Sequence, residues 1–184
     1  MAKEQPQRSH PEARGLVLLS ACILCFISLV SFHANMASQN WLGLAGHGLG
    51  YFLTYLFGVG VYPLLGFAAW MGWTLLVKGK VESYRYKTFF FSLLVLSGMV
   101  LLNLLAEIGF PIPGALKHKL IVESIDFALP YPHHTTRYNL GGVPLYYLYK
   151  DMPTFNLERL FSNAGIAITF SLTGLVAFIL LAEI

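Results

Sequence analysis

The chain has 184 residues, of which 56% are hydrophobic and 11% are charged, and its formal net charge is +3. A soluble domain carries about 25% charged residues, so this composition excludes an ordinary soluble domain and indicates an integral membrane protein. Because the net charge is small, the positions of the charges say more than their sum.

The N-terminal residues 1–14 form a polar, basic segment, which we expect to be a disordered cytoplasmic tail. Residues 15–32 then contain no charged side chain and predict the first membrane span. A secretory signal peptide is the alternative, because a basic start precedes an apolar run. The run is longer than the usual apolar core of about 7–15 residues and no A-x-A cleavage site follows it, which favours a retained signal anchor.

The second apolar run is the longest, with no Asp, Glu, Lys or Arg between Leu42 and Val77, and it predicts a span over about 50–77. Pro63 lies inside this run and predicts a kink, because proline removes a backbone hydrogen bond. Small residues recur at every fourth position and would form one smooth helical strip for close packing. These are Gly46, Gly50, Thr54 and Gly58. The strip suits association of copies or packing within one chain, and the pattern leaves both open.

Two further spans are predicted over 88–106 and 164–182, which are uncharged. The long hydrophilic loop between them, residues 107–163, contains apolar residues at helical spacing that predict a short surface helix over 120–129. Its second half is rich in tyrosine, which suits either contact with lipid headgroups or a small core within the loop. The predicted fold is therefore an all-α integral membrane domain over 15–184, with four spans.

The basic residues predict the orientation of these spans. The tail and the short loop 78–87 together carry seven of the twelve Lys and Arg residues, whereas the predicted loop after the first span carries none. The positive-inside rule then places both termini in the cytoplasm and loop 107–163 outside. The residues on which this depends most are Arg14, Lys78, Lys80, Arg85 and Lys87. Binding of anionic lipid or nucleic acid is an alternative role for the 78–87 cluster, but topology explains it sufficiently.

No catalytic, cofactor-binding or metal-binding set is recognisable. The predicted spans lack the deep ionisable groups that ion-coupled carriers need, and no protease, esterase or complete phosphate-loop motif is present. Two alternatives remain open. A small transporter or channel subunit would need a polar cavity lined by Asn103, Thr54 or the serines of the first span. A membrane enzyme would need a cluster drawn from His133, His134, Glu123 and Asp126.

Three sequence blocks together resemble the N-terminal four-span membrane domain of the FtsK/SpoIIIE family of bacterial DNA translocases. The first is a short basic tail that leads directly into a span, Arg14 to Phe32. The second is N-x-x-G-x-x-G ahead of the second span, here Asn40, Gly43 and Gly46, followed by the run through Gly58 and Pro63. The third is Gly141-Gly142, then Leu157, Leu160-Phe161 and Gly165.

The resemblance implies an anchoring and assembly module at the division septum of the bacterial inner membrane. In the family this domain anchors the protein in the bilayer and contacts other division proteins, and a C-terminal hexameric ATPase moves double-stranded DNA. The glycine spacing of this chain separately predicts a homo-oligomer. The printed sequence contains no linker, Walker motif or winged-helix DNA reader. ATP, magnesium and DNA are therefore expected only in a presumed motor of a larger parent protein. Alternatively, the spans and the outer loop themselves do the work.

Overall fold

The computed structural model describes residues 10–34, 39–126 and 134–183. Within these, four helical segments are long and apolar enough to cross a membrane, which confirms the predicted four-span, essentially all-helical class. They are Pro11–Val30, Gly43–Lys78, Tyr84–Glu107 and Leu157–Glu183. The helices extend by a few residues beyond most of the predicted span limits.

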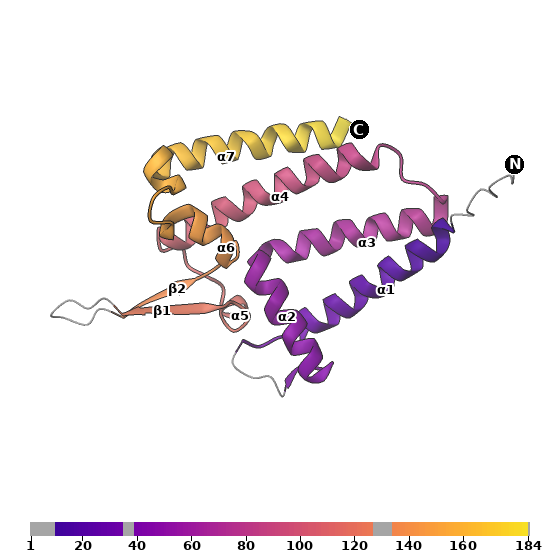
Figure 1. The fold of residues 1–184 in the computed structure, drawn as a ribbon, viewed down its shortest axis with the longest axis horizontal. Helices are drawn as coiled ribbons and strands as arrows, with labels where there is room; N and C mark the ends of the chain where they lie inside the picture. Colours follow the sequence, from indigo (N-terminus) through magenta and orange to yellow (C-terminus); the bar gives the residue numbers. More distant parts are fainter. Residues whose placement is uncertain (1–9, 35–38, 127–133, 184) are drawn as a thin grey trace, which may run out of the picture.

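The long helices form two antiparallel pairs that lie side by side in one layer (Figure 1). Helix α1 (Pro11–Val30) packs along α3 (Val61–Lys78), and α4 (Tyr84–Glu107) packs along α7 (Leu157–Glu183). Contacts between α3 and α4 are sparse. Helix α1 begins, and α7 ends, at the same end of the layer (Figure 1).

Local sequence signals explain where several helices begin and end. Pro11 occupies the first turn of α1, where its missing N–H costs nothing. Gly79 ends α3 in the left-handed conformation, with φ of +69°. The Asn156 side chain accepts a hydrogen bond from the Arg159 amide (2.8 Å) and caps the start of α7. Ser162 interrupts α7 with φ of +56°, so the regular part of this helix follows the interruption.

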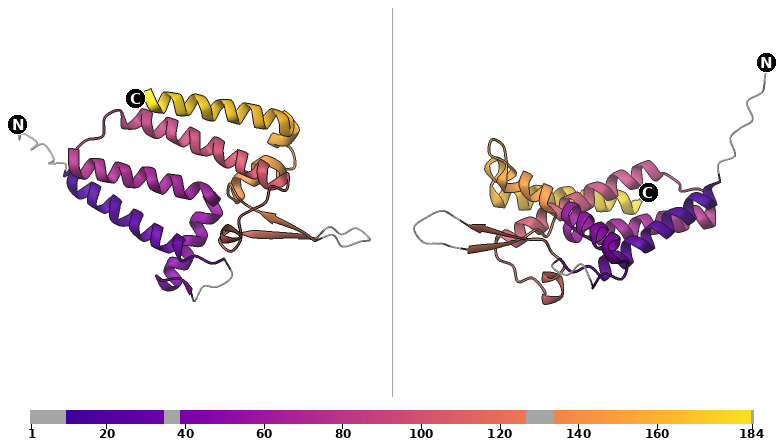
Figure 2. Two further views of the ribbon diagram at one scale, coloured as in Figure 1. Left: turned by 180° about the vertical axis from the view of Figure 1, so that it is seen from behind. Right: turned by 60° about the horizontal axis from the view of Figure 1, so that its bottom comes forward.

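The second span is broken, but not where the prediction placed the break. Helix α2 (Gly43–Phe57) ends in a short 3₁₀ turn, η2 (Gly58–Gly60), from which α3 continues in another direction (Figures 1 and 2). Gly58 has φ of +52°, which glycine adopts readily. Pro63 lies in the first turn of α3, where a proline interrupts no helical hydrogen bond. The bend therefore belongs to the glycine turn, and the predicted kink at Pro63 is wrong.

The short helix predicted over 120–129 is also wrong. Strand β1 (Val122–Asp126) pairs antiparallel with β2 (His134–Tyr138), and residues 127–129 lie outside the described part. The local sequence is rich in β-branched residues, with Ile125 opposite Thr135 in the ladder. Such residues favour a strand. The helical spacing of apolar residues within 120–129 gives no information about a partner strand elsewhere in the chain. This hairpin follows a single helical turn, α5 (Gly114–Lys117).

The tyrosine-rich part of the loop folds back between the spans. The turns α6 (Val143–Tyr146) and η3 (Tyr147–Asp151) bring Tyr146 and Tyr149 into a cluster with α4 and α7. Tyr146 and Tyr149 are buried, whereas Tyr147 is half exposed. The buried tyrosines therefore pack in a core that the loop shares with α4 and α7. The sequence-based alternative of a small core within the loop alone is not what the structure has.

Candidate functional site: a glycine junction and a basic end

The predicted glycine strip is buried inside the chain. Gly46, Gly50 and Thr54 are the buried residues of α2, and Gly58 follows them. A Cβ built on Gly50 would lie 2.9 Å from the Phe32 ring, so no larger residue fits without displacing it. The strip therefore serves packing within one chain, and its buried face is not available to another copy.

Asn40 joins the end of α1 to the start of α2. Its amide nitrogen donates to the Ser28 carbonyl oxygen (3.0 Å), and its side-chain oxygen accepts from the Leu42 amide (3.0 Å). The Ser28 hydroxyl donates to the Gly46 carbonyl oxygen (2.5 Å). A Cβ on Gly46 would lie 2.3 Å from the Asn40 side-chain oxygen, so the position of Asn40 in this chain requires a glycine at residue 46.

A second buried contact, the glycine junction, consists of Gly58, Leu140, Gly141, Gly142 and Asn103. A Cβ on Gly58 would lie 2.1 Å from the Leu140 carbonyl oxygen, and one on Gly141 would lie 2.0 Å from the Met99 carbonyl oxygen. The loop backbone thus passes between η2 and α4 at distances that only glycine permits.

Hydrogen bonds fix the glycine junction. The Val59 amide donates to the Leu140 carbonyl oxygen (2.7 Å), and the Gly141 amide donates to the Asn103 side-chain oxygen (2.8 Å). Asn103 is fully buried in α4. Because α3 and α4 touch little elsewhere, these bonds through the inserted loop hold the two helix pairs together at this end.

Polar contacts from the loop reinforce the same end. Glu107, the last residue of α4, accepts a hydrogen bond from the Tyr146 hydroxyl (2.6 Å) and pairs with Lys150. The Tyr149 hydroxyl donates to the Asn163 side-chain oxygen (2.8 Å). Burial, followed by the nearby carboxylates of Glu158 and Glu107, raises the pKa of Tyr149 to about 12.

Lys119 ties the loop to α1. Its ammonium group donates to the carbonyl oxygens of Val30 (2.8 Å) and Leu29 (3.2 Å), where the last turn of the helix has no internal donors. Burial lowers the pKa of Lys119. No local sequence pattern marks Lys119, Tyr149 or Glu107 as important, because their partners lie far away along the chain.

The opposite end of the layer is the basic end. Lys78 closes α3, Lys80 lies in the turn that follows, and Arg85 and Lys87 lie in the first turn of α4. Arg14 lies in the first turns of α1 at this same end (Figure 1). The five residues predicted to set topology therefore share one end of the layer.

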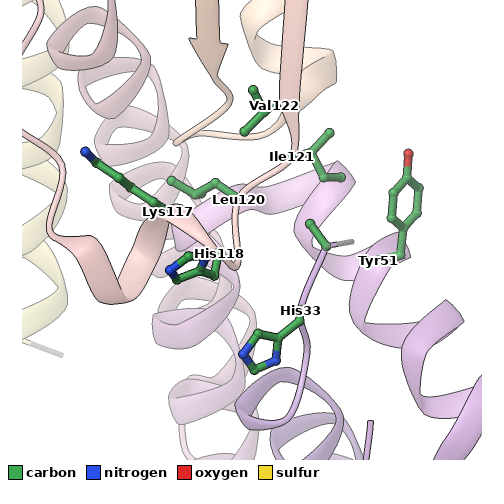
Figure 3. A pocket seen from close by; sticks show the side chains of 8 residues that line it. His33, Tyr51, Lys117, His118, Leu120, Ile121 and Val122 are labelled. Atoms are coloured by element: carbon green, nitrogen blue, oxygen red, sulfur yellow. The ribbon is translucent and has the colours of Figure 1, made fainter. Parts of the chain in front are cut away.

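The cavities hold no assembled reactive centre among the described residues. One hollow of about 310 Å³ has a described lining that includes His33, Tyr51, Lys117 and His118 and no carboxylate, and Figure 3 shows the side chains of Lys117 and Tyr51 well apart from each other. No group of three potential metal ligands occurs in the described part of the chain. His133 lies outside the described residues, as do the side chains of Glu123, Asp126 and His134, so the hypothetical enzyme cluster has no described geometry.

The transporter alternative needs a polar cavity, and the contacts of Asn103 and Thr54 in the described part of the chain bear on it. Asn103 is held by Gly141, and the hollow beside Thr54 measures only about 10 Å³. That is about the volume needed for a single water molecule.

Four apolar helices, joined at one end and basic at the other, define a multi-pass membrane domain. The chain belongs to the family described as the 4TM region of DNA translocase FtsK/SpoIIIE, which matches residues 7–116. This finding confirms the family resemblance.

Individual relatives bear the name of the same family. The chain is similar to DNA translocase FtsK of Chlamydia pneumoniae, at 28% identity over 178 residues that cover 92% of this chain and 21% of that protein. It is also similar to DNA translocase FtsK of Chlamydia trachomatis serovar D, at 28% identity over 151 residues that cover 80% of this chain and 18% of that protein. The chain thus spans about a fifth of the length of these curated relatives. No solved structure matches it.

Proposed function

We propose that the chain is the membrane-anchoring and assembly module of a cell-division DNA translocase, and that it tethers an ATP-driven motor for double-stranded DNA at the division septum. The observation that carries the proposal is the match of residues 7–116 to the four-span region of that family. The share of the relatives that the chain covers, about a fifth, leaves ample length in them for a motor. In this proposal ATP, magnesium and DNA bind in the motor, and the chain itself takes no cofactor.

The arrangement of the helices supports a tethering role. Helix α1 begins and α7 ends at the basic end, so a domain attached after α7 would emerge beside the Lys and Arg residues (Figure 1). The positive-inside rule assigns this end to the cytoplasm of a bacterial inner membrane. A motor on that side would have access to ATP and chromosomal DNA.

Assembly is proposed to use surfaces other than the buried strip. Between 17% and 33% of the residues in the most apolar stretch of each span are buried, so every span leaves side chains accessible to lipid, to other copies or to other division proteins. The exposed side chains of α7 include Leu172, Leu175 and Val176. We propose homo-oligomers through these open faces and contact with other division proteins through loop 107–163.

The test of the proposed function is the position of the chain in dividing cells. A fluorescent protein fused after Ile184 should give a band at the septum, whereas a four-span membrane protein of another family, expressed at the same level, should label the whole envelope. Uniform labelling by both fusions would contradict the septal role.

Orientation is tested on the same cells after Cys22 and Cys25 are replaced by alanine. A membrane-impermeant thiol reagent should label Lys117→Cys in intact cells and should label Glu82→Cys only after lysis. The reverse result would place the basic end outside.

A further inference from the structure

The basic end contains a hollow of about 190 Å³ between the last turn of α3 and the first turn of α4. It is lined by Trp70, Thr74, Lys78, Lys80, Val81, Glu82 and Lys87. Three lysines and one glutamate leave this lining with an excess of two positive charges. The family match describes a four-span region and assigns no ligand to this hollow.

The charges in the hollow are incompletely paired. Glu82 is the one carboxylate in the lining, and it pairs with Lys80 at 3.6 Å between two exposed side chains. Within the described part of the chain, no carboxylate lies within ion-pair distance of Lys78 or Lys87. Two ammonium groups thus border one hollow without an acidic partner.

One wall of the hollow is aromatic, and it is formed by Trp70. The Lys87 ammonium lies 5.7 Å from the centroid of the Trp70 ring, and the Thr74 hydroxyl is turned back to the Trp70 carbonyl oxygen (2.8 Å). Trp70 is 44% exposed. Tryptophan favours the level of the bilayer at which headgroups meet hydrocarbon, so this wall spans the boundary between the two.

The two spans that flank the hollow contact each other at few places. α3 and α4 are joined there by stacking of Phe67 on Phe91 (ring centroids 4.1 Å apart) and by the contact of Lys87 with Trp70. A lipid whose phosphate entered the hollow would lay its acyl chains along this pair of helices. Duplex DNA is too wide for a space of this volume and cannot reach the Trp70 wall at the edge of the hydrocarbon.

We propose that this hollow binds the phosphate of an anionic phospholipid, held by Lys78 and Lys87 with Lys80 at the rim and with the lipid resting on Trp70. The proposal does not depend on the septal role, because it needs only the local geometry and a bilayer that contains anionic lipid. A cluster of cationic side chains directly beside a span attracts anionic lipid strongly enough for selective retention.

The experiment is native mass spectrometry of the purified chain in detergent, with equimolar dioleoyl phosphatidylglycerol and dioleoyl phosphatidylcholine. We expect retention of the anionic lipid to exceed that of the zwitterionic lipid by about tenfold, and we expect the triple variant Lys78→Gln, Lys80→Gln, Lys87→Gln to lose this preference. The matched control, Lys3→Gln, Arg8→Gln, Arg14→Gln, removes three charges from the N-terminal part and should keep the preference.

A second variant separates the hollow from general charge. Thr74→Trp leaves every charge in place but fills the hollow, and it should reduce retention of the anionic lipid as the triple variant does. Equal retention by wild type, Thr74→Trp and the triple variant would overturn the proposal. Displacement of the lipid by equimolar inorganic phosphate would also overturn the proposal, because it would show that the acyl chains contribute nothing. Displacement by a short DNA duplex would overturn it as well, because it would show that the site accepts a duplex.

Discussion

The two ends of the helix layer are built on different principles. At the junction end, backbone segments approach each other at glycines, and the side-chain oxygens of Asn40 and Asn103 accept hydrogen bonds from backbone amides. At the basic end, the helices are joined by a short turn of exposed charged residues. The difference indicates that tertiary stability is concentrated at the junction end, and that the basic end governs orientation and contact with the membrane surface.

The largest expected effect comes from adding one methyl group to the glycine junction. Gly58→Ala places a Cβ against the Leu140 carbonyl oxygen and forces alanine into a positive φ, so it should lower the free energy of unfolding by about 3 kcal/mol. Unfolding of the purified protein by increasing mole fraction of SDS, followed by circular dichroism, measures this change.

The matched control is Gly66→Ala in α3, where a Cβ meets nothing within 4 Å. This substitution should leave stability unchanged or raise it by at most about 1 kcal/mol, because alanine favours the helix. Equal losses for the two variants would show that stability is not concentrated at the junction.

A smaller loss is expected when the hydrogen bond of the glycine junction is removed and its backbone is kept. Asn103→Leu leaves the buried Gly141 amide without an acceptor and should cost about 2 kcal/mol. In the double variant Gly58→Ala, Asn103→Leu, the two losses should be less than additive, because both substitutions release the same loop. Strict additivity in the SDS titration would mean that the two contacts act independently.

Tyr149 offers a test of the same end by pH. Its folded-state pKa of about 12 lies above the ordinary value of 10, so the folded protein holds this proton more strongly than the unfolded chain does. The contribution of the protonated Tyr149 hydroxyl to the stability of the folded protein is therefore fully present below pH 10. It is lost as the pH rises from 10 to 12. Tyr149→Phe also removes the bond to Asn163 and should cost about 1 kcal/mol at neutral pH.

The difference in melting temperature between wild type and Tyr149→Phe isolates this residue from the other groups that titrate at high pH. The difference should shrink between pH 10 and 12. Tyr147→Phe is the control, since Tyr147 is 50% exposed, and it should show no such dependence. A constant difference up to pH 12 for Tyr149→Phe would contradict the assigned cause.

Features that depend on local sequence could be predicted from the sequence. Features that depend on contacts between distant segments could not. The four spans and the basic turn were predictable, because membrane insertion depends on the composition of each segment alone. The bend at Gly58 could not be predicted, because the backbone that requires a glycine there belongs to residues 140–142, far along the chain. The hairpin was missed for a similar reason: Ile125 fits a helix or a strand until its partner Thr135 is known.

The smallest expected effect compares one lysine from each end. Lys80→Gln breaks an ion pair between two exposed side chains and should change the free energy of unfolding by less than about 0.5 kcal/mol. Lys119→Gln removes a cation from the last carbonyl groups of α1 and should cost about 1 kcal/mol. Both substitutions replace a lysine by glutamine. The difference between their free energies of unfolding in the SDS titration therefore reports the different surroundings of Lys80 and Lys119. A larger loss of stability for Lys80→Gln than for Lys119→Gln would show that the basic end holds the helices together. It would contradict the conclusion that tertiary stability is concentrated at the junction end.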